Sequence, residues 1–326
     1  MNVYNREDYF APDTLDNFEK KFGIKINLKT FEDEELMLSE IQSNPRKFDV
    51  VIASDNIVRE LRQTRLLTEI DSNNIPNLKN IDKKFLDPSY DPGNRYSVPY
   101  LWGTTGIVIN RAFIRGDEES WAVLWNPEYK KKIAMLNNGF EVIGSTLKYL
   151  GYSLNTSDVS ELEEAKKKLL EQSPIIAGYL GAIEARNKLI SGELWAVQQH
   201  SGEGMFAIDE NEDLEYFIPK EGAAIRVDSM MIPRDAKHKY TAEVFINYIL
   251  DPKVSADIAN YLWYANCNAA AAPLTDKEIL ESPFLYPDEG TLKRCEFYIE
   301  GNGEEQRIKE QTVNRIWSEL QLKRKQ

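Results

Sequence analysis

The run Phe48-Asp49-Val50-Val51-Ile52-Ala53 decides the fold class. Its consecutive β-branched and apolar side chains are typical of a strand buried on both faces of a parallel sheet. Two strands are predicted before it, at residues 2–4 and 24–28, and the second alternates in polarity like a half-buried strand. These three segments predict the first strands of one sheet.

Helical spacing links the predicted strands. Pro12 opens a first helix, and a second helix is predicted over residues 33–43. We expect its inward-facing side chains to be Leu36, Leu38 and Ile41. Ser54 is predicted to cap a third helix. The resulting β-α-β-α-β order predicts an α/β fold, a parallel sheet with helices on its faces.

The rest of the chain continues in the same style. Further helices are predicted at residues 142–150, from 160, and at 182–190, 240–250, 252–261 and 304–321, with a strand at 194–197. Five tryptophans are interpreted as core residues: Trp102, Trp121, Trp125, Trp195 and Trp263. The acidic run at residues 209–213 is predicted to be a solvated loop.

The composition limits the function. The chain has 326 residues, enough for two domains, and its 42% hydrophobic and 29% charged residues are typical of a globular protein. No apolar run approaches the roughly 20 residues that span a membrane. The net charge of −13 argues against a nucleic-acid partner. It does not establish a cationic ligand, because acidic surfaces also favour solubility.

The sequence lacks metal, cofactor and catalytic signatures. Cys267 and Cys295 are the only cysteines and form no CxxC pair, so we predict neither a Cys/His metal site nor a cofactor. We interpret them as unpaired buried thiols, while a disulfide between them stays open. No Gly-x-Ser-x-Gly, Walker or HExxH motif occurs. Glu141 with Glu203 could form a carboxylate pair, but two isolated acids are no motif, so we expect no enzyme.

Four motifs, spread in order along the chain, carry a resemblance to a known family. They are Asn2-Val3-Tyr4-Asn5, the run Val98-Pro99-Tyr100-Leu101-Trp102-Gly103-Thr104-Thr105-Gly106, Pro219-Lys220-Glu221-Gly222 continuing to Val227-Asp228-Ser229-Met230-Met231-Ile232-Pro233, and Trp263-Tyr264-Ala265-Asn266. Together they resemble the spermidine/putrescine-binding proteins of bacterial ABC importers. The resemblance implies a two-lobed periplasmic-binding-protein fold of type II. Each lobe is then a mainly parallel sheet flanked by helices, and the ligand cleft lies between the lobes.

The resemblance also implies the lobe boundaries. Lobe one comprises residues 1–105 and 228–272, lobe two comprises residues 106–227 and 273–326, and the chain crosses near 100–107 and 225–229. No Pro/Gly/Ser-rich linker divides the chain, which agrees with extended crossings. Such a layout permits hinge closure around a ligand.

The implied partners are a small amine-containing solute and an ABC permease in the membrane. We expect a monomer that works outside the cytoplasm, in the periplasm or on the extracellular face of the membrane. Strand residues follow Met1 at once, so we interpret the sequence as a mature form whose signal peptide has been removed. Lipid anchoring, fusion to a permease, and a sensor or adhesin role without transport all stay open.

The resemblance implies ligand contacts in the loops after the first and third strands, where ligands bind in open α/β sheets. A tryptophan of the family falls on Arg6, and a tyrosine is kept as Tyr9, with the acidic residue Asp8 beside it. A serine of the family is Ser54, and an aromatic residue becomes Asn56. The polar loop positions are therefore kept better than the aromatic ones.

The second lobe is expected to supply further contacts. The first of two family carboxylates falls on Asn138, and the second is kept as Glu141. A family tryptophan falls on His200, and Glu203 follows where some members carry an aspartate.

Near the second crossing the resemblance implies an amine anchor. A family tryptophan falls on Arg226, the anchoring acid is kept as Asp228, and Tyr264 matches a family tyrosine. An ammonium group is bound by carboxylates, and methylene groups by aromatic faces.

The charges of these residues predict the class of ligand. Glu141, Glu203 and Asp228 contribute −3 and Arg6 and Arg226 contribute +2, which leaves −1. That balance suits a zwitterionic or acidic solute better than a bare polyamine, because arginines in the walls repel an ammonium group. Alternatively, an arginine pairs with Glu203 or Asp228 or points away from the cleft, which would leave the polyamine interpretation intact.

Overall fold

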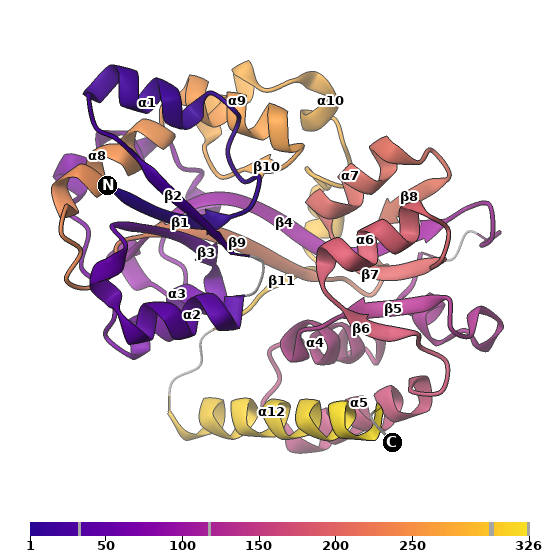
Figure 1. Cartoon of the computed structure of the whole chain (residues 1–326). Helices are drawn as coiled ribbons and strands as arrows, with labels where there is room; N and C mark the ends of the chain where they lie inside the picture. Colours follow the sequence, from indigo (N-terminus) through magenta and orange to yellow (C-terminus); the bar gives the residue numbers. More distant parts are fainter. Residues whose placement is uncertain (32–33, 117–118, 300–302, 325–326) are drawn as a thin grey trace. The chain divides into compact units, whose positions relative to one another are not determined.

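The computed structural model describes residues 1–31, 34–116, 119–299 and 303–324 (Figure 1). The chain divides into two compact units. Unit 1 comprises Met1–Trp102 and Arg226–Glu281, and unit 2 comprises Gly103–Ile225 and Ser282–Gln326. Each unit therefore combines two stretches that are far apart in the sequence.

A parallel sheet forms the centre of unit 1. β1 (Asn2–Arg6) runs parallel to β2 (Asn27–Phe31) on one side and to β3 (Val50–Ser54) on the other. β9 (Ala224–Met231) runs antiparallel to β3. The helices are α1 (Thr14–Phe22), α2 (Glu34–Ser43), α3 (Asp55–Gln63), α8 (Lys239–Ile249), α9 (Pro252–Leu262) and α10 (Lys277–Leu280). The predicted α/β class is confirmed.

Unit 2 contains a mixed sheet. The second half of β4 (Ser97–Asn110) pairs antiparallel with β7 (Ala196–His200) and β8 (Leu214–Phe217). β5 (Ile133–Leu136) runs parallel to β7 and to β6 (Gly178–Leu180). The helices are α4 (Gly139–Tyr149), α5 (Val159–Gln172), α6 (Ala182–Ile190), α7 (Ser201–Glu210), α11 (Glu289–Leu292) and α12 (Glu304–Arg324). Figure 1 shows α12 alongside α5, which it contacts.

Short elements make up many of the connections. The 3-10 helices are η1 (Pro45–Lys47), η2 (Ser72–Asn74), η3 (Pro76–Asn80), η4 (Lys83–Phe85), η5 (Pro92–Asn94), η6 (Trp121–Trp125), η7 (Pro127–Tyr129) and η8 (Ala269–Leu274). The two-residue strand β10 (Ala265–Asn266) pairs with the first half of β4.

The tryptophans predicted to be core residues divide into two groups. Trp102, Trp121 and Trp125 are buried, as predicted. Trp195 and Trp263 are only partly buried, so the prediction is wrong for them. Trp195 stacks on a neighbouring ring with the ring centres 4.9 Å apart, and Trp263 ends α9 in a left-handed conformation with φ of 53°.

The acidic run at residues 209–213 is not wholly a loop. Asp209 and Glu210 form the end of α7, and only residues 211–213 lie in the turn that follows.

Strand β2 begins three residues later than the predicted strand at 24–28. Its pairing with β1 starts with Asn27 opposite Asn2. Residues 27–30 are exposed, and Phe31 is buried. The prediction of a half-buried strand is therefore wrong: pairing with the neighbouring strand, rather than the local alternation of polarity, sets the register.

Helix α2 contacts the core through a different residue from the one predicted. Met37 and Ile41 are fully buried, and Leu38 packs partly against the same cluster, whereas Leu36 is 72% exposed. The inward orientation predicted for Leu36 is wrong. Residues four apart share one face of a helix, so burial of Met37 with Ile41 turns Leu36 outward. The predicted first residue of this helix, residue 33, lies outside the described residues.

We therefore expect opposite results from two adjacent substitutions in α2. Met37→Ala should lower the free energy of unfolding by about 2–4 kcal/mol, because it leaves a cavity in the packed cluster. Leu36→Ala should change it by about 0.5 kcal/mol or less. Urea unfolding of both variants measures the difference, and equal losses would contradict this orientation of the helix.

The motif around Gly222 joins three separate segments of unit 2. Gly222 has φ of 91°, and its carbonyl accepts a hydrogen bond of 2.8 Å from Nε1 of the buried Trp121. A Cβ atom at this position would lie 1.9 Å from the carbonyl oxygen of Arg294. Just beyond that contact, β11 (Glu296–Phe297) pairs parallel with the first residues of β9. The backbone approach therefore requires glycine here.

The described residues give three further results. Cys267 and Cys295 are buried and not disulfide-bonded, as predicted. Of the helices in the described ranges, none combines the length and apolarity that a membrane span requires. Within the same ranges, no group of three or more His, Cys, Asp and Glu side chains is placed to hold a metal ion.

Candidate functional site

In unit 1 the predicted residues lie where the parallel strands end. Arg6 ends β1, Ser54 ends β3, and Asp228 of β9 lies directly opposite Ser54. Because β1 and β3 are parallel neighbours, their carboxyl ends meet at one edge of the sheet. The sequence prediction placed candidate contacts at this edge, and the fold brings these three together.

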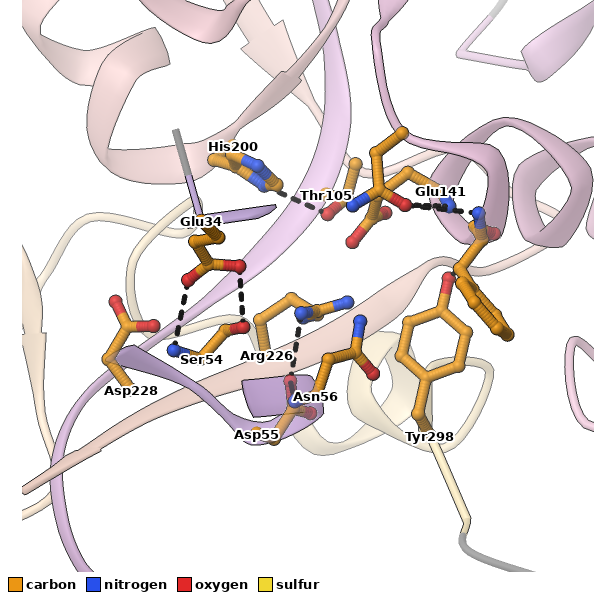
Figure 2. A network of polar contacts seen from close by, with 12 residues as sticks. Glu34, Ser54, Asp55, Asn56, Thr105, Glu141, His200, Arg226, Asp228 and Tyr298 are labelled. Atoms are coloured by element: carbon orange, nitrogen blue, oxygen red, sulfur yellow. Dashed lines mark hydrogen bonds and ion pairs between the residues drawn. The ribbon is translucent and has the colours of Figure 1, made fainter. Parts of the chain in front are cut away.

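A residue outside the prediction, Glu34, connects them. Figure 2 shows the Glu34 carboxylate bonded to both donors of Ser54: the Ser54 hydroxyl donates to Oε2 at 2.8 Å and the Ser54 amide donates to Oε1 at 3.1 Å. Ser54 has the extended backbone of a helix-capping residue, but its side chain accepts no capping hydrogen bond. Ser54 therefore takes the predicted N-cap position of α3 but makes no side-chain capping hydrogen bond, because its hydroxyl donates to Glu34.

Arg6 belongs to the same cluster. Its Nη2 donates to Oε1 of Glu34 at 2.6 Å and lies 4.0 Å from Oδ1 of Asp228. Its guanidinium carbon lies 5.7 Å from the centre of the Phe31 ring. Burial alone would lower the pKa of Arg6, but the charges of Glu34 and Asp228 raise it, so it stays protonated. Arg6 is thus closer to Glu34 than to the predicted amine anchor.

Asp228 is held by tyrosines. The Tyr9 hydroxyl donates to its Oδ2 at 2.5 Å, and burial, followed by the charge of Asp228, raises the pKa of Tyr9 well above its usual value. The Tyr9 ring meets Tyr100 and Tyr264 edge to face, with ring centres 5.7 and 5.8 Å apart. The Tyr100 hydroxyl donates to the Tyr9 carbonyl at 2.7 Å. Tyr100 was missed as a site residue, although it lies within one of the motifs quoted above.

The second arginine pairs with another unpredicted acid. Figure 2 shows Arg226 beside Asp55, with Nη2 2.9 Å from Oδ1 of that carboxylate. Asp55 is 2% exposed and is the first residue of α3. With its amide oxygen turned toward Arg226, Asn56 accepts from both terminal nitrogens, at 3.1 and 3.2 Å. Arg226 therefore has Asp55 as an ion-pair partner, an acid that was not considered from sequence.

Both unpredicted acids share a local signal. Glu34 is the first residue of α2 and Asp55 is the first residue of α3. Carboxylates are favoured in the first turn of a helix, where they meet the positive end of the helix dipole. In open α/β sheets, helices that follow strands also begin at the ligand edge. The sequence position of these acids was therefore informative, although it does not identify their arginine partners. Asp8, in contrast, is exposed, and its role stays a prediction.

In unit 2 the predicted residues form two local groups. Oδ1 of Asn138 caps α4, accepting from the amides of Phe140 at 3.0 Å and Glu141 at 3.2 Å. Glu141 is buried in the first turn of α4. This geometry gives Asn138 a structural role and orients the start of the helix that carries Glu141.

The other group of unit 2 lies at the end of β7. Figure 2 shows His200 beside Thr105, with Nδ1 3.1 Å from the Thr105 hydroxyl. Glu203, in the first turn of α7, accepts from Nη1 of Arg186 at 2.8 Å. The Arg186 guanidinium also lies 4.2 Å from the centre of the Phe206 ring. Arg186 was not predicted, because its helix gave no signal beyond amphipathic spacing.

Known proteins give an independent comparison. Residues 46–294 match the family described as bacterial extracellular solute-binding protein. The spermidine/putrescine-binding periplasmic protein of Salmonella typhimurium is 34% identical over 299 residues, which cover 91% of this chain and 86% of that protein.

Solved structures agree with this result. One is described as a putative spermidine/putrescine ABC transporter from Listeria monocytogenes. It is 35% identical to this chain and has a TM-score of 0.90, and the match covers 99% of both chains. The spermidine/putrescine ABC transporter substrate-binding protein from Streptococcus pneumoniae is 32% identical, with a TM-score of 0.88 and 99% of both chains covered. The resemblance inferred from the sequence motifs is confirmed, and the chain belongs to the family of bacterial extracellular solute-binding proteins.

Proposed function

We propose that this chain binds a small polyamine of the putrescine or spermidine type outside the cytoplasm and delivers it to an ABC permease. The observation that carries the proposal is Asp228, a half-buried carboxylate beside tyrosines. The arginines near Asp228 are paired with other acids. Relatives named for spermidine and putrescine support the same class of solute here.

The charges also support a cation. In unit 1, Glu34, Asp55 and Asp228 contribute −3 and Arg6 and Arg226 contribute +2, which leaves −1. In unit 2, Glu141 and Glu203 contribute −2 and Arg186 contributes +1, which again leaves −1. Together the two sets carry −2, which equals in size the charge of a diammonium ion.

The proposed activity is binding without catalysis. The two lobes would close on the solute. Closure is a population shift, and the solute can shift the equilibrium only by the difference between its binding free energies for the closed and open states. We propose that the protein acts as a monomer with no nucleic-acid partner, in the periplasm or on the extracellular face, anchored by lipid or not. The predicted ligand contacts in unit 1 and unit 2 are part of this proposal, except Arg6 and Arg226, which pair with Glu34 and Asp55.

A second candidate solute is a zwitterion. The distance of 4.0 Å between Arg6 and Asp228 favours it, because an ammonium group and a carboxylate group of one solute could meet opposite charges side by side. The pairing of Arg6 with Glu34 makes this candidate the weaker of the two.

Thermal unfolding with a panel of solutes tests the proposal. A ligand at about 100 times its dissociation constant stabilises by about 2.7 kcal/mol, so putrescine or spermidine should raise Tm by several degrees. Agmatine, γ-aminobutyrate, amino acids and dicarboxylates complete the panel. A shift with zwitterions alone would support the second candidate. No shift with any solute would contradict solute capture and favour a sensor or adhesin.

A further inference from the structure

The charge around Asp228 depends on two acids that bind no solute in the proposed function. Without Glu34 and Asp55, the charges of Asp228, Arg6 and Arg226 in unit 1 sum to +1; with them, the sum is −1. An ammonium group is repelled by the first arrangement and attracted by the second. The sign of the net charge in this half of the site is thus set by Glu34 and Asp55, the partners of the arginines.

Glu34 is built into the fold as a fixed partner. Its carboxylate accepts from the Ser54 amide, the Ser54 hydroxyl and Arg6, so both oxygens are occupied. The Nη2 atom of Arg6 is 2.6 Å from Glu34 and 4.0 Å from Asp228, so Glu34 is the nearer of the two acids. Removing the charge of Glu34 would leave Asp228 as the acid that competes for Arg6.

We propose that Glu34 and Asp55 are specificity-determining residues, which hold Arg6 and Arg226 as neutral pairs and so reserve Asp228 for the ammonium group of a solute. The inference rests on the proposed function. In this arrangement the paired arginines add no net positive charge beside Asp228. Glu34 and Asp55 then decide whether the site accepts a cation or a zwitterion.

Glu34→Gln tests the inference, because glutamine keeps the size of the side chain and can still accept from Ser54. Binding of putrescine and γ-aminobutyrate is measured by calorimetry for the wild type and the variant. We expect putrescine to bind about 10- to 100-fold more weakly, since Arg6 turns to Asp228. The affinity ratio of putrescine to γ-aminobutyrate should also fall, because Arg6, no longer paired with Glu34, can meet the carboxylate of γ-aminobutyrate, whereas putrescine offers only ammonium groups.

Glu40→Gln is the matched control. Glu40 lies on the same helix, α2, and also accepts from three donors: Lys29, Lys47 and the Tyr4 hydroxyl. It touches neither arginine of the cluster. This variant should keep the wild-type ratio of affinities even if its stability changes.

The double variant Arg6→Gln/Glu34→Gln separates charge from structure. With both members of the pair neutral, the competitor for Asp228 is gone, and putrescine affinity should recover to within about threefold of the wild type. A double variant as weak as Glu34→Gln would show a structural loss and overturn the inference. An unchanged ratio in Glu34→Gln would overturn it as well. A wild-type chain that binds no amine would overturn the proposed function itself, which distinguishes the two failures.

Discussion

Asp228→Asn is expected to weaken putrescine binding by about 100-fold or more, which corresponds to roughly 3 kcal/mol. The asparagine removes the charge that meets the ammonium group while keeping the size of the side chain. It also leaves Arg6, whose Nη2 lies 4.0 Å from this position, with one acid fewer. The two effects act in the same direction. Isothermal titration of both proteins measures the loss.

A control for this substitution lies a few residues along the chain. Asp235→Asn removes a carboxylate of unit 1 that is 46% exposed and lies 3.8 Å from Arg46. Asparagine tolerates the positive φ of 67° at this position. Its putrescine affinity should match the wild type. If the Asp228 variant and this control bind putrescine equally well, Asp228 is not part of the binding site.

Gly222→Ala should have the largest effect on stability. The alanine Cβ would lie 1.9 Å from the Arg294 carbonyl oxygen and 2.6 Å from its carbonyl carbon, which are backbone atoms and cannot rotate away. Relief requires the segment that carries β11 to move from β9 or the hydrogen bond from Trp121 to break. We expect a loss of about 4 kcal/mol or more and a fall in Tm of about 10 °C, measured by scanning calorimetry.

Gly151→Ala separates the backbone conformation from the clash. Gly151 has φ of 86°, close to the 91° of Gly222, but a Cβ added at Gly151 would meet no heavy atom within 4 Å beyond its chain neighbours. Its alanine variant should lose only the cost of the left-handed conformation, about 1–2 kcal/mol. If both variants lose the same amount, the close approach to Arg294 contributes nothing.

The buried strand β3 was predictable because local pattern and tertiary environment agree there. The run at residues 48–53 is apolar on both faces, and β3 is buried throughout. The prediction was wrong in α2, where either of two adjacent apolar residues could face the core. Leu36 and Met37 are both apolar, and only packing against Ile41 and the sheet decides which one is buried.

Sequence motifs predicted residues that the fold brings together, but not the pairs that they form. Motif matching located Arg6, Tyr9 and Asp228, which the fold of unit 1 brings into contact. Glu34 lies 28 residues from Arg6 in the sequence. No periodicity connects such a pair, since the contact depends on two strand ends and a helix start meeting at one edge. The charge count made from sequence therefore left out Glu34 and Asp55, the acids that pair with the two arginines.

The hydrogen bond from Tyr9 to Asp228 has a consequence for the entropy of binding. The Tyr9 hydroxyl fixes the carboxylate, and Tyr100 in turn holds the Tyr9 backbone. Ordering a mobile side chain at an interface costs about 0.5–1.5 kcal/mol. The protein orders the Asp228 side chain when it folds, so a solute bound at this proposed anchor would lose less of its binding energy to ordering it.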